Sequence, residues 1–209
     1  MQGPSILKIN EMFWSFQGEG LRSGFPSIFL RLAGCSARCS YCDTRFAWKK
    51  GTLMTLDDII LEIDKHKKKY PCSQVVITGG EPMEQDLSLL VSDLKANGHY
   101  LSIETNGKDY QELDIDWWTV SPKADNDYRI HEALHPLVSE VKLIVTPDLT
   151  VDHVKQVRAI GDHFPIFLQP DWEDNDKHRH TVLLFQECQE LSIWDVRCTV
   201  QLHKVYDVK

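Results

Sequence analysis

The chain has 209 residues, of which 42% are hydrophobic and 26% are charged, which is the balance of a globular protein rather than of a fibrous or disordered one. Its formal net charge of −8 argues against a broad surface for nucleic acid or for an anionic membrane. No signal-peptide pattern or long apolar run is visible, so we expect a single cytoplasmic domain over residues 1–209, with reduced cysteines and no membrane span.

Hydrophobic patterning predicts strands and helices in alternation along the chain. The expected strands are 5–14, 27–32, 74–78, 100–104, 118–120, 140–145, 166–169 and 196–202. The expected helices run from 56 to about 70, from 87 to 96, from 152 to 160 and from 180 to 190. Thr55 and Asp58 have the spacing of a capping box at the start of the first helix. The stretch 171–180 is expected to be a solvated loop.

This alternation is typical of α/β units on a mainly parallel sheet. A complete eightfold barrel needs about 250 residues, and few convincing helices accompany these strands. We therefore expect an α/β fold of a particular kind, a partial, open (β/α) barrel that is shortened in helices.

Polar or glycine-rich segments follow nearly every expected strand. Ligands bind at the carboxyl ends of strands in such sheets, so these segments are predicted to surround one site. They are the cysteine segment 34–44, Gly79-Gly80-Glu81-Pro82, Thr105-Asn106-Gly107, Ser121-Pro122-Lys123, Gln169-Pro170 and Gln201–Lys204.

The most informative segment is the cysteine segment, in which Cys35, Cys39 and Cys42 have the spacing C-x3-C-x2-C. Three thiolates this close in sequence can converge on one metal centre. A structural zinc site requires four ligands, and His66 and Cys72 do not stand at a suitable spacing for the fourth. An iron–sulfur cube with three cysteine ligands keeps one iron open for chemistry.

The segment Gly79-Gly80-Glu81 follows the expected buried strand 74–78. Two glycines let the backbone approach a ligand closely, and the Glu81 carboxylate is able to accept hydrogen bonds from an ammonium group. Taken alone, a Gly-Gly pair before a helix is usually a tight turn.

The cysteine spacing resembles that of the radical S-adenosylmethionine superfamily, as does the aromatic Tyr41 before the third cysteine. The resemblance implies a 4Fe–4S cluster on the three cysteines, S-adenosylmethionine on the open iron, and a 5′-deoxyadenosyl radical formed by its cleavage. It also implies that Gly79-Gly80-Glu81 holds the amino group of that cofactor.

Within the superfamily, an ordered set of motifs along the chain resembles the 7-carboxy-7-deazaguanine synthases. The motifs are Phe16–Gly20, Arg31–Cys35, Tyr41–Thr44, Val76–Pro82, Ile103–Gly107, Ser121–Lys123, Leu168–Pro170 and Gln201–Lys204. The resemblance implies a carbon–nitrogen lyase of queuosine biosynthesis that uses Mg2+. Its reaction is the contraction of 6-carboxy-5,6,7,8-tetrahydropterin to 7-carboxy-7-deazaguanine with loss of ammonia. It also implies a homodimer and a reducing electron donor such as flavodoxin or ferredoxin.

The resemblance assigns a role to each matching residue. Cys35, Cys39 and Cys42 would hold the cluster, and Thr44 would bind Mg2+. The residues expected at S-adenosylmethionine are Tyr41, Cys42, Asp43, Gly79, Gly80, Glu81, Gly107, Ser121, Pro122, Lys123 and Gln169. Those expected at the pterin are Phe16, Gln17, Gly18, Glu19, Arg31, Thr105 and His203, with Arg31 pairing with the substrate carboxylate.

Two other functions are compatible with parts of this pattern. A glycyl-radical activating enzyme would share the cysteine spacing but would not need Gln17, Glu19, Thr44 or His203. A zinc-stabilised interaction module would need a fourth ligand. The isolated Cys72, Cys188 and Cys198 are expected to be small buried or incidental thiols.

Overall fold

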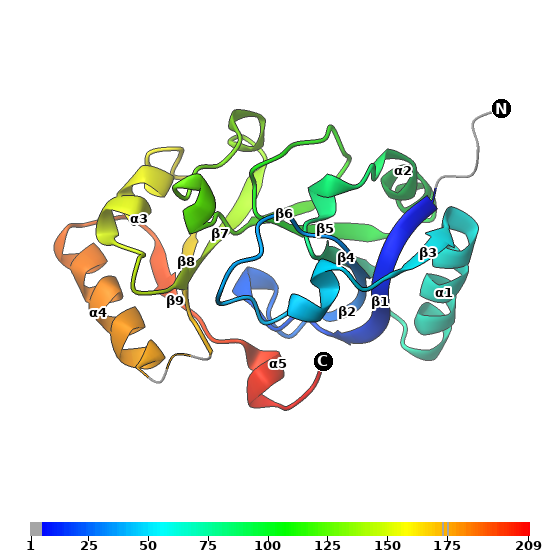
Figure 1. Cartoon of the computed structure of the whole chain (residues 1–209), viewed down its shortest axis with the longest axis horizontal. Coiled ribbons are helices and arrows are strands. Elements are labelled where there is room, and N and C mark those ends of the chain that lie inside the picture. Colours follow the sequence, from blue (N-terminus) through cyan, green and yellow to red (C-terminus); the bar gives the residue numbers. More distant parts are fainter. Residues whose placement is uncertain (1–5, 173, 175) are drawn as a thin grey trace.

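The computed structural model describes residues 6–172, 174 and 176–209, and its described strands form one sheet with the order β3-β1-β2-β4-β5-β6-β7-β8-β9 (Figure 1). The strands are β1 (Ile6–Phe16), β2 (Pro26–Leu32), β3 (Thr52–Thr55), β4 (Gln74–Gly79), β5 (Tyr100–Thr105), β6 (Trp117–Val120), β7 (Val138–Val145), β8 (Ile166–Pro170) and β9 (Val196–Cys198). Ser5, which was expected to begin the first strand, lies outside the described residues.

Neighbouring strands in the run β2-β4-β5-β6-β7-β8-β9 pair in parallel, whereas β1 pairs antiparallel with β2 and with β3. The sheet is open, because β3 and β9 stand at its two edges. This arrangement confirms the predicted α/β fold with a mainly parallel, open sheet. It also brings the carboxyl ends of the parallel strands to the same edge.

The helices are α1 (Leu56–Lys69), α2 (Ser88–Ala96), α3 (Val151–Arg158), α4 (Lys177–Glu190) and α5 (Leu202–Val205). Figure 1 shows α1 and α2 together near one end of the sheet and α3 and α4 near the other. The predicted cap of α1 is present, since the Thr55 hydroxyl accepts a hydrogen bond of 3.2 Å from the Asp58 amide. Between β5 and β7 the described chain has strand β6 and two short 3-10 turns but no α-helix, which agrees with a barrel shortened in helices.

The core lies between the sheet and these helices. Ile28, Leu30 and Ile77 of the sheet are fully buried, as are Ile59 and Leu90 of the helices. Burying each such side chain contributes about 1.5–3 kcal/mol, so the strands that carry the polar segments are held firmly in place.

The last predicted strand is wrong beyond Cys198, where β9 ends and the chain leaves the sheet. The Leu202 amide donates a 2.9 Å hydrogen bond to the Gly18 carbonyl, and a short helix, α5, begins there. The tertiary contact therefore overrides the strand-like pattern of 196–202.

Two further differences concern short segments. Strand β3 was not predicted, because it is a four-residue edge strand whose Leu53 is exposed. Helix α4 begins at Lys177, so residues 177–180 of the predicted loop are helical, while Glu173 and Asn175 lie outside the described residues. In the described part of the chain, we find no helix with the length and apolar character that membrane crossing requires.

Candidate active site

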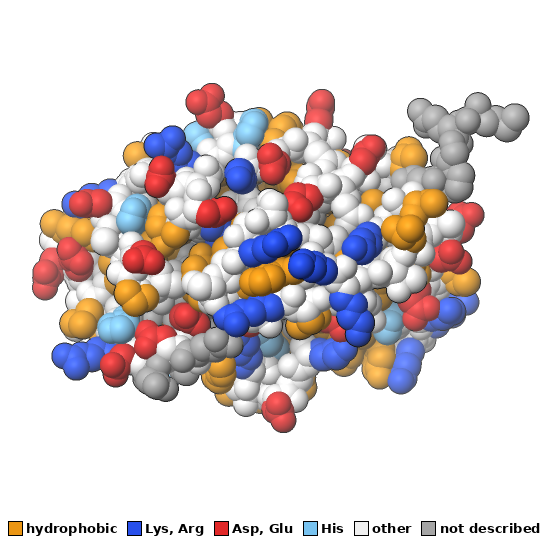
Figure 2. All heavy atoms as spheres, viewed as in Figure 1, with side chains coloured by type: hydrophobic (Ala, Val, Ile, Leu, Met, Phe, Trp, Pro, Cys, Tyr) orange, Lys and Arg blue, Asp and Glu red, His pale blue; other side chains and the backbone are white. Residues whose placement is uncertain are grey.

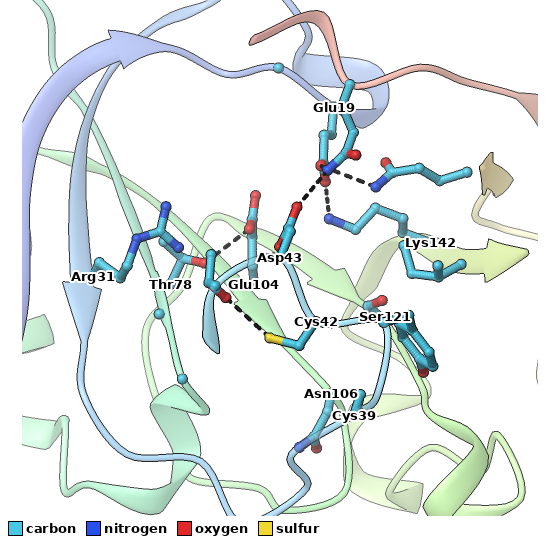
Figure 3. A pocket seen from close by; sticks show the side chains of 18 of the residues that line it. Glu19, Arg31, Cys39, Cys42, Asp43, Thr78, Glu104, Asn106, Ser121 and Lys142 are labelled. Carbon is cyan, nitrogen blue, oxygen red and sulfur yellow. Dashed lines mark hydrogen bonds and ion pairs between the residues drawn. The ribbon is translucent and has the colours of Figure 1, made fainter. Parts of the chain in front are cut away.

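A cavity of about 530 Å³ opens at the carboxyl ends of the parallel strands (Figure 3). Nearly all of the residues singled out in the sequence line it. From the cysteine segment and the strand ends they are Cys35, Cys39, Tyr41, Cys42, Asp43, Thr44, Gly79, Gly80, Glu81, Ser121, Lys123 and Gln169. From the expected pterin set they are Phe16, Gln17, Gly18, Glu19, Arg31, Thr105 and His203.

Gly107 and Pro122 do not line this cavity. Gly107 has a φ of 75°, and a Cβ atom there would lie 2.4 Å from Cγ1 of Val120. Its place in the structure is thus explained by close packing beneath the strand ends. Pro122 is buried next to Ser121.

The cysteine segment is a loop fastened at several points. The Cys42 amide donates to the Cys39 carbonyl (3.1 Å), and the Gly34 amide donates to the Ala47 carbonyl (2.9 Å). All three thiols are only partly buried, and burial raises the pKa of Cys35. Among the residues that the structure describes, no three His, Cys, Asp or Glu side chains gather closely enough for one metal ion. Three thiols along one cavity wall are the donor set of an iron–sulfur cluster, in which each iron takes its own thiolate.

Gly80 brings the end of β4 against the cysteine loop. The Gly80 amide donates to the Leu32 carbonyl (3.0 Å), and the Glu81 amide donates to the Gly34 carbonyl (2.7 Å). A Cβ atom on Gly80 would lie 1.7 Å from that Gly34 oxygen and 3.2 Å from Cβ of Cys35. Glycine is therefore needed for the close approach of the two loops.

Glu81 is buried and ties β4 to the end of β5. Its carboxylate accepts hydrogen bonds from the Thr105 hydroxyl (2.6 Å), the Asn106 amide (2.7 Å) and the Met83 amide (3.1 Å). Burial outweighs these bonds and raises the pKa of Glu81. Both Glu81 and Thr105 are thus engaged with the protein itself, so they fix the cavity wall.

Arg31 and Thr44 offer the cavity a guanidinium group and a hydroxyl group, respectively. Arg31 Nε donates to Glu11 Oε1 at 3.1 Å, and its guanidinium lies 5.7 Å from the Phe13 ring centre. The Thr44 hydroxyl lies 3.5 Å from the Cys42 sulfur. A carboxylated ligand in this cavity would meet the Arg31 guanidinium and a hydroxyl next to the Cys42 sulfur.

Glu19 is the centre of a buried hydrogen-bond network. Lys142 Nζ pairs with its Oε2, while the amides of Gln169 (3.1 Å) and Gln201 (2.7 Å) donate to its Oε1. Burial opposes ionisation of Glu19, but the Lys142 ammonium prevails and holds its pKa below the usual range. Burial likewise opposes the charge of Lys142, yet Glu19 and Glu104 raise its pKa.

Residues near the C-terminus, in and just before α5, cover one side of the cavity. Lys204 Nζ donates to Asp43 at 2.7 Å, and Gln201 donates to the same oxygen at 3.1 Å. Although burial raises the pKa of Asp43, these two donors lower it to about 2. His203 lies against Gly18, where a Cβ atom would be 2.2 Å from its Nδ1, and burial lowers the pKa of His203.

Several residues that line the cavity received no individual role from the sequence, namely Thr78, Glu104, Asn106, Lys142, Gln201 and Lys204. Glu104 accepts hydrogen bonds from Gln17 Nε2 (2.8 Å) and from the Thr78 hydroxyl (3.0 Å). Asn106, Gln201 and Lys204 stand in the strand-end segments predicted to surround the site, and Thr78 and Glu104 stand directly before two of those segments. Lys142 could have been noticed for a different reason, because it is the one charged residue in the apolar run 141–145, which is typical of a strand buried on both faces.

Comparison with known proteins gives consistent results along the chain. The sequence model of the Radical SAM superfamily matches residues 30–141. The 7-carboxy-7-deazaguanine synthase of Bacteroides thetaiotaomicron is 37% identical over 97% of this chain and 98% of its own length. That of Synechocystis is 33% identical over 96% and 93%, respectively. The crystal structure of QueE from Escherichia coli is 29% identical, covers 95% of both chains and superimposes with a TM-score of 0.78.

Proposed function

Because this chain belongs to the radical S-adenosylmethionine superfamily and, within it, to the 7-carboxy-7-deazaguanine synthases, we propose that its cavity binds 6-carboxy-5,6,7,8-tetrahydropterin together with Mg2+. As a member of this family, the chain is a carbon–nitrogen lyase of queuosine biosynthesis. The proposed reaction contracts the ring to 7-carboxy-7-deazaguanine and releases ammonia. The observation that carries the proposal is that the thiols of Cys35, Cys39 and Cys42 line the same cavity as Arg31 and Glu19.

The superfamily implies a 4Fe–4S cluster and S-adenosylmethionine, and the cavity fits both. The three thiols supply soft ligands at one wall, and the backbone of Gly79-Gly80, which lines the same cavity, packs directly against the strand and loop that precede the cysteines. When bound, these groups supply a 5′-deoxyadenosyl radical that removes a hydrogen atom from the substrate. Ser121, Lys123 and Gln169 line the same region and are proposed to hold the cofactor.

We propose that Thr44 binds Mg2+ and that Arg31 pairs with the substrate carboxylate. Mg2+ prefers oxygen ligands and keeps several waters, so one hydroxyl and one substrate carboxylate suffice as its other ligands. Asp43 is already engaged by Lys204 and Gln201, which leaves Thr44 as the oxygen ligand next to Cys42.

At the opposite wall, the Gln17–Glu19 segment is proposed to read the edge of the pterin, with backbone groups of Phe16 and Gly18 assisting. Glu19 is ionised and accepts hydrogen bonds, whereas Gln17 offers an amide that already links Glu19 with Glu104. His203 stands over Gly18 and would close this side of the ring.

We further infer that a low-potential carrier such as flavodoxin or ferredoxin reduces the cluster, and that the enzyme works as a homodimer in the cytoplasm. The partly exposed cysteine loop supports electron delivery from a partner protein. Exposed apolar side chains near the cavity-closing segment, among them Val205 and Tyr206, support a subunit contact.

The test is anaerobic reconstitution with iron and sulfide, followed by turnover of the tetrahydropterin acid with S-adenosylmethionine. We expect the deazapurine and ammonia in equal amounts, with Mg2+ accelerating turnover of metal-depleted enzyme and T44V losing that response. The C39A variant is expected to lose iron and all S-adenosylmethionine cleavage, whereas C198A, at a cysteine outside the cavity, retains both. Cleavage of S-adenosylmethionine without deazapurine would contradict the substrate, and zinc without iron in anaerobically purified protein would contradict the cluster.

A further inference from the structure

Lys142 is a buried charged group to which the reaction scheme above gives no part. It stands in the middle of β7 and is 9% exposed, and its ammonium points toward Glu19 across the cavity wall (Figure 3). A lysine is rarely buried unless it is paired, because the loss of hydration costs several kcal/mol. The burial of Lys142 beside the cavity therefore indicates that it holds another group in place.

The group that Lys142 holds is the Glu19 carboxylate. An ionised carboxylate accepts about four hydrogen bonds. Two amides, from Gln169 and Gln201, fill the positions on Oε1, and Lys142 takes one on Oε2. One acceptor position on Oε2 thus stays open for a ligand in the cavity.

Electrostatics single out Lys142 among the cavity lysines. Glu19, Glu104 and Asp43 all favour its charged form. Lys123, by comparison, donates to the Ser121 hydroxyl at 2.7 Å and, in the part of the chain that the structure describes, forms no ion pair with a carboxylate. The Gln17 side chain accepts a hydrogen bond from the Glu19 amide and donates one to Glu104. It therefore connects two of the acidic residues that favour the charged form of Lys142.

We propose that Lys142 is a positioning residue for ligand recognition, which keeps Glu19 ionised and oriented so that its open lone pair accepts an N–H of a 2-amino-4-oxopyrimidine ring. A ring with a 2-oxo group in that place would set a carbonyl oxygen against a carboxylate and is rejected. The inference rests on the proposed function, because it takes the pterin to lie against Glu19. It adds a determinant of specificity that does not touch the substrate itself.

The experiment measures how the K142M variant binds two probes, 6-carboxypterin and its 2-oxo analogue. Calorimetric titrations use anaerobic, cluster-loaded enzyme with S-adenosylmethionine and Mg2+. A hydrogen bond to a charged group is worth a factor of about 10–100 in affinity. We expect wild type to prefer the amino ring by about that factor, and K142M to bind both probes about equally, with unchanged affinity for S-adenosylmethionine.

The matched control is K204M, which removes another cavity lysine that pairs with a carboxylate, Asp43. Because Glu19 keeps its partner, K204M is expected to retain the preference for the amino ring. If K142M is too unstable to purify, K142Q, which keeps a polar group beside Glu19 but removes the positive charge, is expected to show the same loss of preference.

Three results would overturn the inference. The first is a K142M enzyme that keeps the wild-type preference, which would leave Lys142 with a purely structural role. The second is loss of the preference in K204M as well, since the effect would then not depend on Glu19. The third is a wild-type enzyme that binds neither probe, which would contradict the proposed substrate and the inference together.

Discussion

The contact between Gly80 and the cysteine loop gives the sharpest prediction. In G80A, the new methyl carbon would lie 1.7 Å from the Gly34 oxygen, so one of the two loops must move by more than about 1 Å to reach ordinary contact. Overpacking of this kind costs about 1–3 kcal/mol. The movement also breaks the 2.7 Å hydrogen bond from the Glu81 amide to Gly34, which adds about 1 kcal/mol.

We therefore expect G80A to lose about 2–4 kcal/mol of stability, a fall in Tm of roughly 5–15 °C for a chain of this size. Because Cys35 follows Gly34 directly, the same displacement is expected to lower the iron and sulfide content after anaerobic reconstitution. Differential scanning calorimetry of the apoprotein and metal analysis of the reconstituted enzyme measure the two effects separately.

The matched control is G98A, at the end of α2. Gly98 has a φ of 74°, and no atom lies within 4 Å of the position that a Cβ would take. Alanine there is therefore expected to cost only the backbone strain of a positive φ, about 1–2 kcal/mol of stability. Iron uptake by G98A is expected to equal that of wild type. A G80A protein that melts no lower than G98A and takes up the same iron would refute the reasoning about the two loops.

Three further predictions test other parts of the site and fold. G18A is expected to displace His203, raising KM for the pterin about tenfold or more in steady-state assays, since its Cβ would lie 2.2 Å from the ring; an unchanged KM would contradict the contact. Burial raises the pKa of Cys188 to about 11, so alkylation at pH 8 followed by mass spectrometry should modify exposed Cys198 while Cys188 reacts only in denaturant. T55A removes the α1 cap and is expected to lower stability by about 1 kcal/mol, or Tm by 2–4 °C, without altering turnover; a change in turnover would contradict a purely structural cap.

Much of the fold could be predicted because its strands are buried on both faces and read as apolar runs. Residues 74–78 and 166–169 gave β4 and β8 almost to the residue. The parallel order then placed polar strand ends at one edge, which is why most predicted site residues line one cavity. Periodicity was insufficient for β3 and for α5, since a short edge strand and a one-turn helix depend on tertiary contacts rather than on their own pattern.

The site residues that escaped prediction share a physical reason. Glu104, Lys142 and Gln201 act through partners far away in sequence, and no local pattern encodes which partner a side chain meets. Gly107 illustrates a second kind of contact that no local pattern encodes, because its lack of a side chain permits close packing against Val120. Partners of this kind become visible only when the strands are placed next to one another.

The hydrogen bonds around α5 bear on the order in which the site is assembled. Gln201 and Glu19 are 182 positions apart, and Lys204 and Asp43 are 161 apart. Closing so long a loop by itself is entropically costly, so these contacts are favoured once the sheet has already brought the two segments together. The sheet and the cysteine loop can therefore be in place while the α5 side is still open. A cluster inserted before these contacts form would enter through a wider opening than the one left after Lys204 pairs with Asp43 and His203 lies against Gly18.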